Sequence, residues 1–347
     1  LCHTLAGMLM LGVFLYTQTD TPSYPTLFAL YSLSVAFYMP TLALSNSVAY
    51  TSLEQAGLDL VKSFPPIRVF GTVGFICTMI TVSLVGVEAT SGQFAVSGII
   101  GLVLAVYSQT LPNCPTAPKG QSKSLVEALG LRAFVLFKER KMALFFIFSM
   151  LLGVSLQITN GFANPFISTF GEIPAYADTF GVKHANILIS LSQLSETLCI
   201  LLIPFALRRF GIRRVMLIAM TAWVLRFALL GLGDPGSGVW LFLLSMIVYG
   251  VAFDFFNVSG SLFVDKETDP SIRSSAQGLF MIMTNGIGAT LGSLGAQAVI
   301  SHFVYSEHDV YARLAGWSLS WYLFAAYAAI VAVLFAVLFR YRADRAR

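Results

Sequence analysis

Long apolar segments recur along the whole chain, and they constrain its fold more than any other feature. A membrane-spanning helix needs about 20 predominantly apolar residues. The segments are continuous rather than alternating, which favours helices over the strands of a membrane barrel. We therefore predict an all-α polytopic membrane protein. Its ten expected spans cover residues 1–17, 25–50, 67–87, 91–111, 142–169, 185–206, 214–233, 238–263, 275–301 and 315–340.

Composition agrees with this class, since only 11% of the residues are charged and 56% are hydrophobic. A soluble domain has about a quarter charged residues. The chain contains no P-loop, HExxH, GxGxxG or cysteine cluster, which argues against ATP-driven pumping and a metal site. The segment GIGATLGSLGA, with Gly288 and Gly292, fits close helix packing better than a phosphate loop. We expect no cofactor, no nucleic acid partner and no obligate protein partner.

The distribution of Lys and Arg predicts the orientation, because cytoplasmic loops carry an excess of both. Alternate loops are rich in them, and the tail RYRADRAR adds four arginines, whereas the intervening loops hold only Lys183 and Arg313. Both ends of the chain are therefore expected in the cytoplasm. The residues on the basic side are Lys62, Arg68, Lys119, Lys123, Arg132, Lys138, Arg140, Lys141, Arg208, Arg209, Arg213, Arg214, Lys266 and Arg273.

The longest loop, residues 112–141, divides the chain. Its first part is polar and contains prolines, as linkers do, and its second part is typical of an amphipathic helix along the membrane interface. We expect part of an N-terminal bundle at 1–111 and a six-helix bundle with a short tail at 142–347. Transporters with two six-helix halves are common, so we interpret the chain as lacking two N-terminal spans. A genuine ten-span protein is the alternative.

Several polar side chains lie inside the predicted spans. Burying a charge at mid-bilayer costs at least about 2.5–3.5 kcal/mol, so such groups face a protein interior or a watery cavity. Gln193 and Glu196 are three residues apart and share one helical face, and Gln157 and Asn160 repeat that spacing in the fifth predicted span. The alternative for the amide pair is a hydrogen bond between helices, worth about 0.6–2 kcal/mol.

The eighth predicted span carries Tyr249, Phe253 and Asn257 along one stripe, with Asp254 close to Asn257. Amides and carboxylates bond hydroxyls and base edges, and aromatic rings stack on flat faces. The inventory suits a small, uncharged, hydroxyl-rich solute that bears a ring. The alternatives are a structural hydrogen bond between Asp254 and Asn257 and ordinary packing of the two aromatic rings.

Two arginines are candidate partners for the buried carboxylates. The alternative role for Glu196 is an ion pair with Arg226 or with Arg68, which lies at the edge of the third span. For Arg226 we favour a structural role, as the partner of a carboxylate or a helix end, over contact with a ligand.

Five blocks occur in an order that resembles a known family. They read YMPTLALSNSVAY, SFPPIRVFGTVGF, SLQITNGF, SQLSETL and YGVAFDFFNVSGSLFV. The chain resembles the bacterial nucleoside:proton symporters of the major facilitator superfamily, and IRVFGTVGF is also similar to a stretch of lactose-permease-type sugar symporters. The resemblance implies a twelve-helix fold in the inner membrane, of which this chain would supply helices three to twelve. It also implies nucleosides of the uridine and adenosine type and protons as the transported partners.

Carried over block by block, the resemblance implies a set of substrate-binding residues. They are Arg68, Thr72, Phe75, Gln157, Asn160, Gln193, Glu196, Tyr249 and Phe253. A carboxylate in a low-dielectric site is costly when ionised and can load a proton, so Asp254 and Glu196 are the candidates for proton coupling. We favour Asp254 for the proton and Glu196 for the sugar, although the reverse assignment, or one residue in both roles, stays open.

Three other functions remain to be compared with nucleoside transport. A carrier of a sugar or another small polar solute would use the same carboxylates. A membrane sensor or scaffold is disfavoured, because no signalling domain is attached. An intramembrane enzyme is disfavoured, because the polar residues form no nucleophile–base pair.

Overall fold

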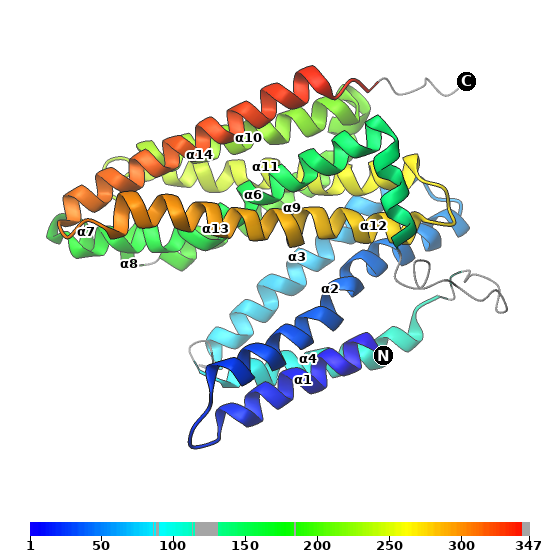
Figure 1. Ribbon diagram of the computed structural model, residues 1–347, viewed down its shortest axis with the longest axis horizontal. Coiled ribbons are helices and arrows are strands. Elements are labelled where there is room, and N and C mark those ends of the chain that lie inside the picture. The colour runs from blue at the N-terminus through cyan, green and yellow to red at the C-terminus, as the bar shows by residue number, and fades with distance from the viewer. Residues whose placement is uncertain (86, 88–89, 113, 115–130, 184, 342–347) are drawn as a thin grey trace. The chain divides into compact units, whose positions relative to one another are not determined.

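The computed structural model describes residues 1–85, 87, 90–112, 114, 131–183 and 185–341 (Figure 1). The regular elements within these residues are all helices, as the apolar segments predicted. The chain divides into two compact units. The smaller unit comprises residues 1–60 and 70–124, and the larger comprises residues 61–69 and 125–347.

The smaller unit contains three packed helices and most of a fourth. Its elements are α1 (Cys2–Thr17), α2 (Tyr24–Gln55), α3 (Leu60–Leu84) beyond residue 69, α4 (Gly92–Tyr107) and η1 (Ser108–Thr110). Helix α1 packs against both α2 and α4. A Cβ on Gly98 would lie 2.9 Å from the carbonyl oxygen of Gly7, so only glycine allows these backbones to approach so closely.

The larger unit contains the start of α3 and all elements after residue 130. They are η2 (Leu131–Lys138), α6 (Arg140–Thr169), η3 (Phe170–Glu172), α7 (Pro174–Ala177), α8 (Phe180–Lys183), α9 (Ala185–Phe210), α10 (Ile212–Leu232), α11 (Val239–Glu267), α12 (Arg273–Met281), η4 (Ile282–Gly288), α13 (Ala289–Ile300), η5 (Ser301–Tyr305) and α14 (Val310–Leu338). Helix α10 packs against α11 and α14, and Figure 1 shows α10 and α14 side by side. Helix α11 also packs against α9, while α6 packs against η4, α13 and α14.

Aromatic side chains fill much of this unit's interior. The ring of Phe166 on α6 lies 5.5 Å from that of Trp321 on α14 and 5.7 Å from that of Phe242 on α11. All three residues are buried. Large rings contribute more apolar contact than aliphatic side chains and pack well edge to face. These rings therefore join α6, α11 and α14, and a hydrogen bond from Tyr327 on α14 to the carbonyl of Leu151 on α6 adds to the contact.

The predicted span 275–301 forms one continuous helical run with π-helical turns at η4 and η5. Small residues bring η4 and α13 close to α6. A Cβ on Gly292 would lie 2.7 Å from the carbonyl oxygen of Val154, and one on Gly288 would collide with the carbonyl oxygen of Met150. The close packing predicted for these two glycines is confirmed.

Nine helices of the described residues are long and apolar enough to cross a membrane, and the shorter Cys2–Thr17 matches the first predicted span. The boundaries agree within a few residues, except that α3 begins at Leu60 rather than at 67. Arg68 therefore lies inside a helix rather than at its start. The linker in 112–141 falls mostly outside the described residues, and the described part of the predicted amphipathic helix is the 3-10 helix η2.

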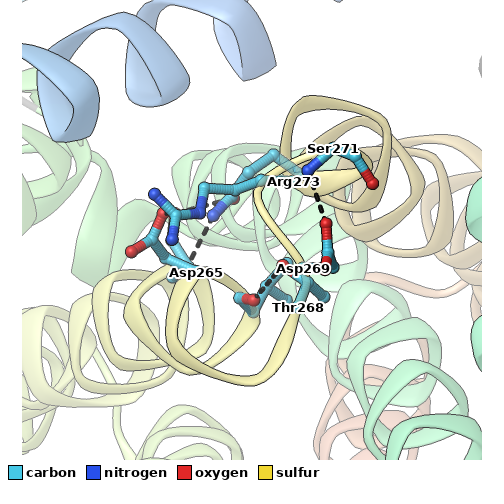
Figure 2. A network of polar contacts seen from close by, with 8 residues as sticks. Asp265, Thr268, Asp269, Ser271 and Arg273 are labelled. Atoms are coloured by element: carbon cyan, nitrogen blue, oxygen red, sulfur yellow. Dashed lines mark hydrogen bonds and ion pairs between the residues drawn. The ribbon is translucent and has the colours of Figure 1, made fainter.

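The turn between α11 and α12 holds a network of polar contacts (Figure 2). Arg273 Nε lies 3.0 Å from Asp265 Oδ1. The backbone N–H of Ser271 donates to Asp269 Oδ1 over 2.8 Å, and Thr268 Oγ1 donates to the carbonyl of Val264 over 2.6 Å. Of these contacts, the Arg273–Asp265 ion pair joins the end of α11 to the start of α12, and the two hydrogen bonds lie within the end of α11 and the turn.

Candidate functional site

Glu196 lies on α9 where that helix meets α11. A Cβ on Gly250 would lie 2.6 Å from the carbonyl oxygen of Ser195, so the two backbones are nearly in contact. The Ser195 hydroxyl also donates to the carbonyl of Ile247. These contacts determine the rotation of α9, and Glu196 is buried as a result. Gln193 is half-buried one turn earlier.

Arg68 provides a positive charge close to Glu196. Its Nη2 atom lies 3.9 Å from Glu196 Oε1, with 30% of the arginine side chain and 8% of the glutamate side chain exposed. The ion pair expected as one alternative for Glu196 is therefore present, and its partner is Arg68. At this distance the positive charge of Arg68 lowers the free-energy cost of burying the Glu196 carboxylate. Because the guanidinium is partly exposed and has five N–H donors, some of them are available to another molecule.

Asp254 is fully buried on α11. Neither of its carboxylate oxygens has a hydrogen-bond partner among the described residues. The alternative of a structural hydrogen bond to Asn257 is therefore wrong. Glu196 and Arg68 lie within electrostatic range of it. An ionised carboxylate is costly where nothing donates to it, which distinguishes Asp254 from Glu196 with its nearby arginine.

The aromatic pair Tyr249 and Phe253 stacks one turn apart on α11, with ring centroids 5.8 Å apart and planes inclined by 16°. The Arg226 guanidinium lies 4.6 Å from the centroid of the Tyr249 ring. Arg226 Nη1 also donates to the carbonyl of Ser245 over 2.7 Å. Trp223 meets the Tyr249 ring edge-on at 5.9 Å. Tyr249 is thus held between a cation and an indole.

Arg226 has the structural role that its sequence context favoured, but its partners differ from those expected. Within the described part of the chain it forms no ion pair with a carboxylate. It contacts a ring, a backbone carbonyl and, over 3.4 Å, Thr159 Oγ1 on α6. Sequence spacing could not reveal this arrangement, because the partners lie on two other helices, α6 and α11.

The amides of Gln157, Asn160 and Gln193 form no hydrogen bond among the described residues. Gln157 is half-buried, with its Cβ 3.1 Å from the place of a Cβ on Gly292, and Asn160 is exposed. The alternative that the Gln157–Asn160 pair bonds helices together is therefore not observed. Amides inside a membrane protein that have no protein partner are available to a ligand or to water.

Two of the expected residues belong to the smaller unit. Thr72 is buried, and 53% of Phe75 is exposed. They follow Arg68 by four and seven residues, so the three share one face of α3.

Asn285 is a polar residue that the sequence analysis did not select. It lies in the π-helical turn η4 and lines, with Phe253 and Asn257, a cavity of about 10 Å³. That volume is at the lower limit for one water molecule. A π-helical turn shifts side chains out of α-helical register and often accompanies a functional site. The glycines around this segment were the only sequence signal for it.

Comparison with known proteins places this arrangement among transporters. The family profile described as "Nucleoside H+ symporter" matches residues 1–344. Nucleoside permease NupG of Escherichia coli (strain K12) is 46% identical over 343 residues, which are 99% of this chain and 79% of that protein. Xanthosine permease of the same organism is 50% identical over 345 residues, covering 99% and 80%.

Solved structures give the same result. A crystal structure of nucleoside transporter NupG is 46% identical and matches with a TM-score of 0.71, covering 98% of this chain and 82% of that one. A bacterial homologue of the iron transporter ferroportin, 14% identical, matches with a TM-score of 0.58 and supports the fold alone. The predicted major facilitator fold is confirmed.

Proposed function

Because the chain belongs to the nucleoside:proton symporter family, whose members are transporters rather than enzymes, we propose that it carries nucleosides together with protons across a bacterial inner membrane. The substrates are of the uridine and adenosine type. Transport proceeds by alternating access, in which helical bundles rock around a substrate site. Both ends of the chain face the cytoplasm, since the basic connections lie on that side.

The observation that carries the substrate assignment is the set of unpartnered amides. Gln157, Asn160 and Gln193 have no hydrogen bond within the described residues, although all three lie in helices long enough to cross a membrane. Because Gln193 lies one turn before Glu196, both side chains lie on one face of α9. Their oxygen and nitrogen atoms can bond hydroxyl groups, and we assign both residues to the ribose. Gln157 and Asn160 bond the edge of the base, which can both donate and accept.

The aromatic pair supplies the flat contact. Phe253 stacks on Tyr249 and is itself half-buried, so one face of the pair is available to a base. Arg68, Thr72 and Phe75 contribute from one face of α3, with Phe75 as the alternative stacking partner. The single positive charge of Arg68 is already shared with Glu196, which suits a nucleoside better than a phosphorylated nucleotide.

Asp254 carries the coupled proton in this proposal, and Glu196 binds the sugar. Asp254 is the deeper of the two, and its carboxylate oxygens have no hydrogen-bond partner in the described residues. A carboxylate without donors is easily made neutral by a proton, and the charge of Glu196 nearby makes ionisation of both groups unfavourable. Substrate binding at Glu196 and proton binding at Asp254 are thereby linked.

The test is uptake of labelled uridine by the purified chain in liposomes, with and without an inward proton gradient. We expect gradient-driven accumulation that adenosine and xanthosine inhibit and lactose does not. Glu196→Gln loses a charge-assisted hydrogen bond of about 1.5–3 kcal/mol, so the KM should rise about 10- to 100-fold. Asp254→Asn should abolish accumulation and retain exchange.

The outcomes separate the proposal from its alternative. Gradient-driven accumulation of labelled lactose without accumulation of uridine would support the carrier of a sugar or another polar solute instead. Normal pH-driven accumulation by Asp254→Asn would show that the proton is carried elsewhere.

A further inference from the structure

A basic cavity lies between the first turn of α6 and the last turn of α14, and its lining shares no residue with the candidate substrate site. Its volume is about 510 Å³. The lining combines cationic and apolar side chains, namely Arg140, Lys141, Leu144, Val337, Leu338, Phe339 and Arg340. All of these belong to the larger unit.

Two of its three cations have no ion-pair partner among the described residues. Lys141 pairs with Glu267 and lies 5.8 Å from the centre of the Tyr341 ring, and Tyr341 also donates to Glu267 over 2.7 Å. Arg140 and Arg340 are exposed, and neither forms an ion pair within the described part of the chain. The negative charge of Glu267 is thus already neutralised, and two guanidinium groups remain for an anion.

The two helix ends at the cavity differ in their effect on an anion. The first turn of α6 begins at Arg140, and its N-cap residue makes no side-chain cap hydrogen bond, so the partial positive charge of this helix end is not offset by a cap. The last carbonyls of α14 would repel an anion, but Arg213 covers them. Its Nε donates to the carbonyl of Phe339 over 2.6 Å and its Nη2 to that of Ala336 over 2.5 Å.

The apolar part of the lining continues along the outside of α14. Val337 is 56% exposed and Leu338 is 40% exposed, and Val333 and Leu334 extend this surface by one turn. In a membrane-spanning helix such a surface contacts acyl chains. The cavity therefore places guanidinium groups directly beside the surface that contacts lipid tails.

We propose that this cavity binds the headgroup of an anionic glycerophospholipid, a phosphate diester of the phosphatidylglycerol class. The phosphate lies between Arg140 and Arg340, each able to donate two hydrogen bonds to its oxygens. The acyl chains follow Leu144 and Val337. The proposal rests on the membrane position and orientation proposed above, since anionic lipids are attracted to basic pockets on the cytoplasmic side. It is independent of the transported solute.

Native mass spectrometry of the detergent-purified chain tests the proposal. The protein is titrated with phosphatidylglycerol or phosphatidylcholine of the same acyl composition. We expect one phosphatidylglycerol to be retained in preference to phosphatidylcholine. Each basic residue near a bilayer surface contributes about a fivefold gain in binding, so the double variant Arg140→Gln/Arg340→Gln should weaken retention about 25-fold.

The matched control is Arg208→Gln/Arg209→Gln, which removes two exposed arginines from the last turn of α9. It changes the net charge equally and leaves the cavity intact, so retention should stay within twofold of the parent chain. Equal loss in both double variants would overturn the proposal, because it would indicate a nonspecific charge effect. Unchanged retention in the cavity variant would overturn it as well.

Inorganic phosphate separates a lipid site from a site for a free anion. Millimolar phosphate should not displace the retained lipid, because it cannot use the apolar wall. Displacement by phosphate alone would overturn the lipid assignment. Uptake of uridine is measured separately, so failure of nucleoside transport and failure of lipid retention remain distinguishable.

Discussion

Arg226 offers the sharpest test of how the larger unit positions its aromatic pair. Replacing it by methionine keeps a long side chain and removes the charge. The change deletes the contact with the Tyr249 ring at 4.6 Å and the hydrogen bond to the Ser245 carbonyl at 2.7 Å. Arg226 itself would touch no substrate, since 2% of it is exposed.

Favourable and unfavourable contributions of Arg226 determine how far its replacement changes the free energy of unfolding. A hydrogen bond from a charged donor contributes about 1.5–3 kcal/mol, and a desolvated cation–π contact about 2 kcal/mol. Removing a buried cation returns several kcal/mol of desolvation, so replacement by an apolar side chain is often nearly neutral for stability. We therefore expect the free energy of unfolding to change by less than about 2 kcal/mol. The Tyr249 ring then loses the cation–π contact with Arg226 that helps to orient it.

That loss should appear in substrate binding. A term of about 2 kcal/mol corresponds to about a 30-fold change in affinity. We expect Arg226→Met to raise the KM for uridine about 10- to 30-fold with little change in Vmax, because uniform binding is weakened. The assay is initial-rate uptake in liposomes, with thermal unfolding of the same preparation as the measure of folding.

Two variants serve as controls. Arg226→Lys keeps the charge near the ring and should recover part of the KM. Trp223→Phe disturbs the edge of the same ring without a change of charge, so its effect on KM should be smaller. The reasoning is refuted if methionine leaves the KM unchanged in a folded protein, or if all three variants raise it equally.

Three further predictions concern helix contacts and turns. Gly250→Ala should destabilise the protein by about 1–3 kcal/mol, because the added methyl overlaps the backbone of α9, whereas Gly295→Ala meets no atom within 4 Å and should not lower the melting temperature. Arg213→Gln should cost about 1.5–3 kcal/mol through loss of its charged donors to the end of α14, while the exposed Arg214→Gln serves as its control; equal melting temperatures would contradict this role. The hydrogen bond from a backbone N–H two residues on lowers the pKa of the Asp269 carboxyl. This hydrogen bond should therefore stabilise the turn at pH values above the ordinary pKa of a carboxyl group, and the stabilisation should disappear as the pH falls through the lowered pKa. Hydrogen exchange of the Ser271 amide measures the effect. Loss of the stabilisation already near pH 5 would contradict the prediction.

The hydrophobic pattern was sufficient for the secondary structure, and five sequence blocks indicated the family. The bilayer requires that each backbone group be satisfied within its own segment, so a long apolar run becomes a helix almost independently of its neighbours. Nine spanning helices and α1 were therefore predictable within a few residues, among the described parts of the chain. The exceptions lie where polar residues belong to a helix, as at the start of α3.

Spacing along one helix also identified which polar residues share a face. It selected Gln193 with Glu196 and Gln157 with Asn160, because residues three apart are neighbours on any helix. It could not determine whether an amide meets another helix, since that depends on how each helix is rotated. The finding that these amides have no hydrogen bond among the described residues needed the tertiary structure.

The partners of the buried charges were decided by tertiary structure alone. Glu196 and its cation Arg68 are separated by much of the chain, Arg226 faces a ring rather than a carboxylate, and Asp254 has no donor within the described residues. Periodicity defines a direction on one helix but neither the neighbour that the direction meets nor its distance. Helix lengths and faces thus follow from local chemistry, whereas the pairing of charges follows from packing between helices.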